Sequence, residues 1–217
     1  MQTLTKQLID LKLSNRVLTD AQLARVIEGS KQRRYHLVNR AIKAGELLRL
    51  RRGSYLLAEP FRDYPIHPFA LAQAFVPGSY VSYETALAHH GWIPEAVYTT
   101  ASVTPGRKSL EYEYAVFGHF SFHPLATQPG YFLELVEREQ SREQTMLVAR
   151  PIRALMDLVC MKKAEWQGMD WLQESLRIEY ETLRQVTGAE IRTLKLVYKH
   201  QRVIRFLDAL ARELGND

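Results

Sequence analysis

The sequence predicts an α+β protein with an N-terminal winged helix-turn-helix, followed by a mixed α/β domain whose C-terminal part is helical. Two observations carry this prediction. Residues 1–60 contain three stretches with helical spacing of apolar residues, followed by two short β-prone runs that flank a glycine. After a proline-rich connector at residues 59–66, β-like runs predominate to about residue 150, and the spacing is then helical to the end. We therefore predict domains at residues 1–60 and 61–217.

Composition indicates a folded cytoplasmic protein. The 217 residues are 46% hydrophobic, which is sufficient for one large or two modest cores. No window approaches the roughly 18 to 20 continuous apolar residues of a membrane span, and the N-terminus lacks the apolar core of a signal peptide. The single cysteine, Cys160, stands in the apolar run ALMDLVCM, which predicts a buried thiol and excludes a disulfide framework. We expect no membrane partner.

The N-terminal region begins with two predicted helices. Leu4, Leu8 and Leu11 recur at helical spacing in TLTKQLIDLKL, which forms the first. Thr19 or Asp20 caps the second, which ends at Gly29. The spacing predicts two short helices before the basic part of the chain.

The third predicted helix runs from its cap, Ser30, to about Ala44 and is basic on its exposed face. Val38, Ala41 and Ile42 form its buried stripe. A rotation of about 100° per residue from this stripe turns cations and amides outward. Cations can contact phosphates, and amides can contact base edges. The candidate DNA-binding residues of this helix are Ser30, Lys31, Gln32, Arg33, His36, Asn39, Arg40 and Lys43.

A short hairpin with arginines at its tip follows the third helix. The runs ELLRL and SYLLAE are β-prone, and Gly53 lies between them. Two helices, a basic helix and a hairpin in this order are typical of a winged helix-turn-helix, in which the third helix enters the major groove and the wing contacts phosphate or the minor groove. The candidate wing contacts are Arg49, Arg51, Arg52 and Ser54.

The charge is concentrated in this region. Residues 1–60 hold twelve Lys and Arg against five Asp and Glu, a net charge of +7, so the remaining residues carry −2 of the chain's +5. A basic helix alone is also compatible with a solvated surface. Its coincidence with a basic wing favours double-stranded DNA as the partner, with arginines anchoring phosphates and Gln32, His36 and Asn39 supplying base preference.

The second domain combines both kinds of element. Helical spacing predicts helices at 67–75, 83–91, 151–163, 169–186, 189–200 and 202–214, and β-like runs lie at 97–104, 111–117, 119–125, 131–139 and 145–149. The helical part contains three large aromatic residues that belong either to its core or to an interaction surface, namely Trp166, Trp171 and Tyr180.

Catalytic patterns are absent from the sequence, and we expect no enzyme. In TPGRKS, Arg107 separates the glycine from the lysine and a strand follows, which excludes a phosphate-binding loop. This favours a basic loop that presents Arg107 and Lys108 to solvent or to the DNA backbone. Glu111 and Glu113 are typical of the polar face of an antiparallel sheet rather than of a nuclease.

Histidines raise the question of a metal site. His119 and His123 share one face of a predicted strand, and His89 and His90 lie on a predicted helix. Because no cysteine pair or carboxylate stands at ligand spacing from them, we predict no metal and no cofactor.

Several stretches resemble one family. AIKAGELLRLRRGSYLL at residues 41–57 is similar to the wing of the AbiEi-type antitoxins, the transcriptional regulators of type IV (abortive infection) toxin–antitoxin operons, and the later stretches SYVSYETALAHHGWIPE, VYTTASVTPGRKS and ARPIRALMDLV resemble its core domain. The resemblance spans about residues 19–160. It implies a repressor of its own operon that binds promoter DNA, with inverted repeats expected there.

The resemblance also implies that the second domain neutralises a nucleotidyltransferase-like toxin without forming a stable complex. Arg107 and Lys108 are then candidates for the antitoxin surface. The alternative is a winged-helix regulator whose second domain senses a ligand or a protein partner, with no toxin involved.

Overall fold

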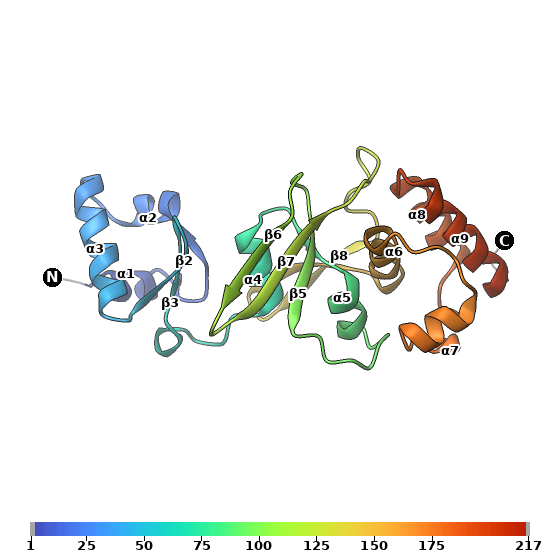
Figure 1. Cartoon of the computed structure of the whole chain (residues 1–217). Helices are drawn as coiled ribbons and strands as arrows, with labels where there is room; N and C mark the ends of the chain where they lie inside the picture. The colour runs from blue at the N-terminus through green and yellow to red at the C-terminus, as the bar shows by residue number, and fades with distance from the viewer. Residues whose placement is uncertain (1–2, 216–217) are drawn as a thin grey trace. The chain divides into compact units, whose positions relative to one another are not determined.

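The chain folds into two compact units, and the division between them falls after His67. Figure 1 shows the elements of each. The computed structural model describes residues 3–215. Helices are combined with strands, and the strands of the described residues form two sheets, so the fold class is α+β. None of the described helices is long and apolar enough to cross a membrane.

The first unit contains short helices and a small antiparallel sheet. Its three strands are ordered β1-β3-β2. β1 pairs Leu18 with Tyr55 of β3 and was not predicted, because two residues are too short to show an alternation. The elements are α1 (Leu4–Asp10), β1 (Leu18–Thr19), α2 (Asp20–Val26), α3 (Lys31–Lys43), β2 (Leu47–Arg51), β3 (Ser54–Leu57) and the 3-10 turn Glu59–Phe61.

α2 and α3, the two helices that precede the hairpin, both begin with a side-chain cap. Thr19, rather than Asp20, is the N-cap of α2, where its hydroxyl and the Gln22 side chain form a capping box. Ser30 caps α3 by accepting a hydrogen bond from the backbone N–H of Arg33. The predicted stripe of α3 is shifted by one residue, because Leu37 is buried and Ile42 is only half-buried.

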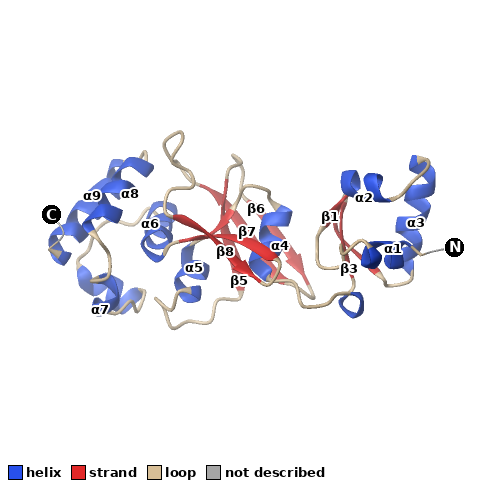
Figure 2. Ribbon diagram, turned by 180° about the vertical axis from the view of Figure 1, so that it is seen from behind, coloured by secondary structure: helices blue, strands red, loops and turns tan. Residues whose placement is uncertain are grey.

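The second unit is built on a six-stranded mixed sheet ordered β6-β7-β5-β4-β9-β8. α5 and α6 pack together beside the sheet, and α8 and α9 pack against each other, with α9 in contact with α6 (Figure 2). Its strands are β4 (Tyr80–Val81), β5 (Thr99–Thr104), β6 (Leu110–Tyr114), β7 (Gly118–Pro124), β8 (Val136–Ser141) and β9 (Gln144–Ala149). Its helices are α4 (Pro68–Phe75), α5 (Tyr83–His89), α6 (Pro151–Lys162), the π-helical turn Trp171–Ser175, α7 (Tyr180–Leu183), α8 (Gly188–Val197) and α9 (Gln201–Leu214).

Several predicted elements of this unit are shorter than expected, and three of them show a clear structural reason. The strand predicted at 131–139 begins only at Val136, after a turn in which Leu135 has φ +53°. The helix predicted at 169–186 is broken near Arg177, which has φ +52°, and the break lets Ile178 enter the core. The helix predicted at 189–200 ends at Val197, because Tyr198 turns into extended backbone and is buried.

The aromatic residues of the helical part are divided between core and surface. The rings of Trp166 and Trp171 pack edge-on against Phe206, at centroid distances of 5.0 and 6.1 Å. The Tyr180 side chain is partly exposed. Both tryptophans therefore contribute to the core, whereas Tyr180 faces solvent.

Candidate functional site

The exposed face of α3 carries most of the polar residues that the sequence selected. Asn39 is half-buried, and the other seven candidate residues of this segment are exposed. A shallow hollow of about 650 Å³ follows the face and is lined by Arg33, His36, Leu37, Asn39, Arg40 and Lys43. These side chains form one continuous surface along the helix.

A second hollow, of about 730 Å³, lies between α3 and the β2–β3 hairpin. It brings Lys31 and Asn39 of the helix together with Arg49 and Arg52 of the hairpin. Its remaining lining residues are Asp20, Arg34, Tyr35, Val38, Gly53 and Tyr55. Asn39 borders both hollows, so the helix face and the hairpin form one polar surface.

Local contacts on α3 orient the side chains at its beginning. The Gln32 amide lies 3.0 Å from His36 Nε2, one helical turn later. Arg33 Nη1 donates to the carbonyl of Glu28 at 2.8 Å. Two of the predicted base-reading side chains, Gln32 and His36, are therefore held against each other.

The sequence reading missed Arg34 and Tyr35, which both line the second hollow. Tyr35 is 60% exposed, and its ring lies edge-on to His36 with centroids 5.9 Å apart. The signal was present, because Lys31, Tyr35 and Asn39 are spaced by four residues and share one helix face. A large exposed aromatic side chain on this face can contact a base or a sugar.

The tip of the hairpin is shaped by Gly53. This residue has φ +75°, and a Cβ atom here would lie 2.9 Å from Asp20 Oδ2. The backbone N–H of Asp20 also donates to the Gly53 carbonyl at 3.0 Å. The Asp20 carboxylate can move aside, so it is the positive φ that favours glycine at this position of the hairpin tip.

The hairpin arginines differ in how they are held. The guanidinium of Arg49 lies 5.9 Å from the ring centre of Tyr55, and Arg51 Nε donates to Ser54 Oγ at 3.4 Å. Ser54 is only 3% exposed, so its hydroxyl is placed to support Arg51 and is not on the surface. Arg52 is exposed. Burial, together with the carboxylate of Asp20, raises the pKa of Tyr55, so its hydroxyl stays protonated at neutral pH.

The cations of this surface lack acidic partners within their unit. Among residues 3–67, no carboxylate forms an ion pair with the eight cations Lys31, Arg33, Arg34, Arg40, Lys43, Arg49, Arg51 and Arg52. Asp20 lines the same hollow as four of them without such a contact. The surface therefore keeps an uncompensated positive charge.

Arg107 and Lys108 lie in the second unit. Both are exposed, in the loop between β5 and β6. Glu111 and Glu113 are exposed on β6, which pairs antiparallel with β7.

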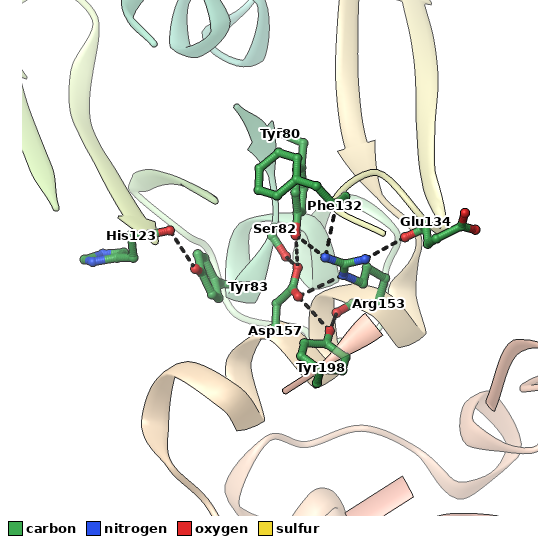
Figure 3. Close-up of polar contacts among 9 residues, drawn as sticks. All are labelled: Tyr80, Ser82, Tyr83, His123, Phe132, Glu134, Arg153, Asp157 and Tyr198. Atoms are coloured by element: carbon green, nitrogen blue, oxygen red, sulfur yellow. Dashed lines mark hydrogen bonds and ion pairs between the residues drawn. The ribbon is translucent and has the colours of Figure 1, made fainter. Parts of the chain in front are cut away.

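A buried ionic network at the beginning of α6 was not predicted (Figure 3). Arg153 and Asp157 are fully buried, and Arg153 Nε donates to Asp157 Oδ1 at 2.9 Å. The carboxylate also accepts hydrogen bonds from the hydroxyls of Tyr80, Ser82 and Tyr198, at 2.9, 2.7 and 2.7 Å.

The guanidinium group of Arg153 also has several hydrogen-bond partners. Arg153 donates to the carbonyl oxygens of Glu134 and Phe132, at 2.7 and 3.3 Å, and to the Tyr80 hydroxyl at 2.6 Å. A charged pair four residues apart inside the apolar run PIRALMDLV was the available signal. The network ties β4, the 132–134 turn and the end of α8 to α6.

Cys160 lies on the same helix and is a buried free thiol, as predicted. Burial raises the pKa of this thiol to about 11, with a smaller effect from the charge of Asp157. The thiol therefore stays protonated and unreactive at neutral pH.

The histidines are arranged differently from the sequence-based expectation. His119 and His123 have separate partners, since His119 Nδ1 lies 3.3 Å from Thr99 Oγ1 and His123 packs against the ring of Tyr83. His89 and His90 lie together with Glu139 of β8. No carboxylate stands at ligand spacing from these histidines in the sequence, but the fold brings Glu139, 50 positions away, to within 2.8 Å of His89.

No protein-family model matches the chain, and the search of curated proteins finds no significant match. The resemblance to AbiEi-type antitoxins therefore stays a prediction.

Proposed function

We propose that the first unit is a winged helix that binds double-stranded DNA, and that the protein is a transcriptional repressor. The element order α1, β1, α2, α3, β2, β3 is the order of a winged helix-turn-helix, in which the third helix reads the major groove. The observation that carries the proposal is the continuous surface of α3 and the hairpin, where eight cations have no acidic partner within the unit.

In this mechanism the two parts of the surface have separate roles. Arg40 and Lys43 on the helix, with Arg49 and Arg52 on the hairpin, neutralise phosphates and release counterions. Asn39, which borders both hollows, and Tyr35, which lines the second, contact base edges or sugars, while Gln32 and His36 act as a hydrogen-bonded pair. Arg51, supported by Ser54, contacts phosphate from the edge of the hairpin.

The experiment that tests DNA binding is a gel-shift titration at two salt concentrations. The purified protein is titrated against its own upstream promoter and against a random duplex of equal length. We expect the promoter to bind at least about a hundredfold more tightly, which is within the usual range for specific binding. Equal binding of both duplexes would contradict a repressor, and binding of neither would contradict a DNA-binding unit.

For the second unit we propose the role that the resemblance implies, an antitoxin for a nucleotidyltransferase-like toxin that acts without a stable complex. Arg107 and Lys108, exposed on their loop, are the candidate residues. The test is co-expression with the nucleotidyltransferase encoded beside it, where the intact chain should restore growth and an Arg107→Ala/Lys108→Ala variant should restore less. If no such gene lies nearby, the antitoxin role loses its partner.

One feature favours the alternative role of ligand sensing. A hollow of about 470 Å³ beside α5 is lined by Tyr83, Thr85, Tyr98, His123 and Met161, among other residues. Its volume is within the range of ligand pockets. Tyr83 has φ +57°, a strained conformation for an aromatic residue, and such strain is found at functional sites. A small molecule that changes promoter affinity in the intact chain, and not in a Tyr98→Ala variant, would support this role.

A further inference from the structure

The end of α5 and the middle of β8 bring two imidazoles and a carboxylate together. His89 is the last residue of α5, His90 is its C-cap and Glu139 belongs to β8. One potential ligand atom from each side chain lies within 4.8 Å of the other two. His89 Nε2 is 2.8 Å from Glu139 Oε2, and the two histidine rings are 5.0 Å apart.

We infer that His89, His90 and Glu139 form a binding site for a divalent transition metal ion of the zinc class. Two histidines and one glutamate are ligands that zinc prefers, and three protein ligands leave a fourth position for water. The site is separate from the surface of α3 and the hairpin and does not depend on the function proposed for it.

The distances require only a small adjustment. Tetrahedral zinc with ligands at about 2.0–2.1 Å places its ligand atoms about 3.3 Å apart. His89 Nε2 and Glu139 Oε2 are only 2.8 Å apart, so these two atoms must separate slightly to admit the ion. The ligand atom of His90 lies within 4.8 Å of both and must approach by about 1.5 Å or less. The side chains of His89 and Glu139 are 32% and 27% exposed, so solvent ions reach them and both can change rotamer.

His90 makes the kind of outer-shell hydrogen bond that supports metal-ligating histidines. Its Nε2 donates to the carbonyl oxygen of Ala149 at 2.9 Å. In the neutral ring this bond leaves the lone pair on Nδ1, which is then free to bind a metal, and such a hydrogen bond to a carbonyl is usual for ligating histidines. Phe69 packs edge-on against His89, with centroids 5.1 Å apart, and limits the positions of that ring.

Without metal, the His89 imidazole and the Glu139 carboxylate form an ordinary hydrogen bond. The two states are distinguishable, because only a metal site makes the stability of the second unit depend on zinc. Bound zinc would link α5 to β8 across 50 residues of sequence.

The test uses the full-length chain without a histidine tag. Zinc affinity is measured by competition with a chromophoric chelator, and Tm is measured with zinc and with excess chelator. We expect one tight site per chain, a Tm that rises with zinc, and an affinity at least about tenfold weaker in His89→Ala and in Glu139→Gln. His200→Gln, which changes an exposed histidine elsewhere, is the matched control and should bind as the wild type does.

Tm with chelator shows whether each variant is folded, and Glu139→Gln preserves the shape of the side chain if His89→Ala is unstable. His90 is not the primary target, because its bond to Ala149 supports the fold. Equal zinc affinity in the wild type, His89→Ala and Glu139→Gln would overturn the site, as would a Tm that does not respond to zinc.

Discussion

The two units use their charges in opposite ways. In the second unit, Arg150 bonds to both Glu137 and Glu190, Lys162 bonds to Glu84, and Arg153 and Asp157 are paired in the core. In the first unit, the cations of α3 and the hairpin have no such carboxylate partner among residues 3–67.

This difference separates charges that support the fold from charges that are available to a partner. Most pairs of the second unit join different elements, so removing one member affects the packing of both. Exposed, unpaired cations cost little in water and release counterions when they meet phosphates. The contrast predicts that charge removal reduces stability in the second unit and DNA affinity in the first.

The largest effect is expected in the buried pair. Asp157→Ala leaves the guanidinium of Arg153 uncompensated in the core and should lower the free energy of unfolding by about 3–5 kcal/mol. Urea denaturation followed by circular dichroism measures this loss. The double variant Arg153→Met/Asp157→Leu removes both charges and should recover part of the loss, since the hydroxyls of Tyr80, Ser82 and Tyr198 lose Asp157 in both variants. A loss below about 1 kcal/mol for Asp157→Ala would show that the pair does not hold the second unit together.

The next effect is on DNA affinity. Arg49→Ala/Arg51→Ala/Arg52→Ala should weaken binding to all duplexes by about a hundredfold at low salt, and should make the dependence of log K on log salt shallower by about 0.9 for each lost phosphate contact. Titrations at several salt concentrations measure both quantities. The matched control is Arg177→Ala/Arg184→Ala/Lys195→Ala, which removes the same charge at three paired cations of the second unit. This variant should bind DNA with nearly the affinity of the wild type. An equal loss of DNA affinity in both variants would mean that the cations of the hairpin contribute no more to binding than those of the second unit.

A smaller effect concerns which sequence is preferred. Asn39 lies where the two hollows meet. Asn39→Ala should lower the ratio of promoter affinity to random-duplex affinity by about tenfold, since a good base contact contributes about 1–3 kcal/mol of discrimination. Competition gel shifts with both duplexes measure the ratio. Equal weakening on both would assign Asn39 to backbone contact instead.

Local signals in the sequence were sufficient for much of the fold. The cap Ser30, the glycine at position 53 and the helical spacing in α3 and α9 all act within a few residues, and these elements are found close to their predicted places. The failures depend on distant partners. Tyr198 leaves its helix to bond to Asp157, 41 residues away. The turn at Phe132–Glu134 supplies carbonyl oxygens to Arg153.

The same division applies to the candidate sites. The basic face of α3 follows from helical geometry alone, so its exposed cations were predictable. The same geometry would have found Tyr35, but the hollow between α3 and the hairpin, to which α2 contributes Asp20, required the packing of three elements. Glu139 approaches His89 only because the end of α5 lies beside the β8–β9 hairpin, a contact across 50 residues that no local pattern encodes.

The smallest effect is expected at an exposed pair of the second unit. Lys162 Nζ lies 2.7 Å from Glu84 Oε1, and the side chains are 47% and 33% exposed. Solvent screens this pair, and ordering two long side chains costs entropy, so Glu84→Gln should lower the free energy of unfolding by less than about 1 kcal/mol. Urea denaturation at low salt and at 1 M salt measures the loss, which should shrink at high salt, where the Debye length falls to about 3 Å. If Glu84→Gln lost as much stability as Asp157→Ala, the exposed and the buried pair would contribute equally to the free energy of unfolding. Stability would then depend on the number of ion pairs rather than on their burial.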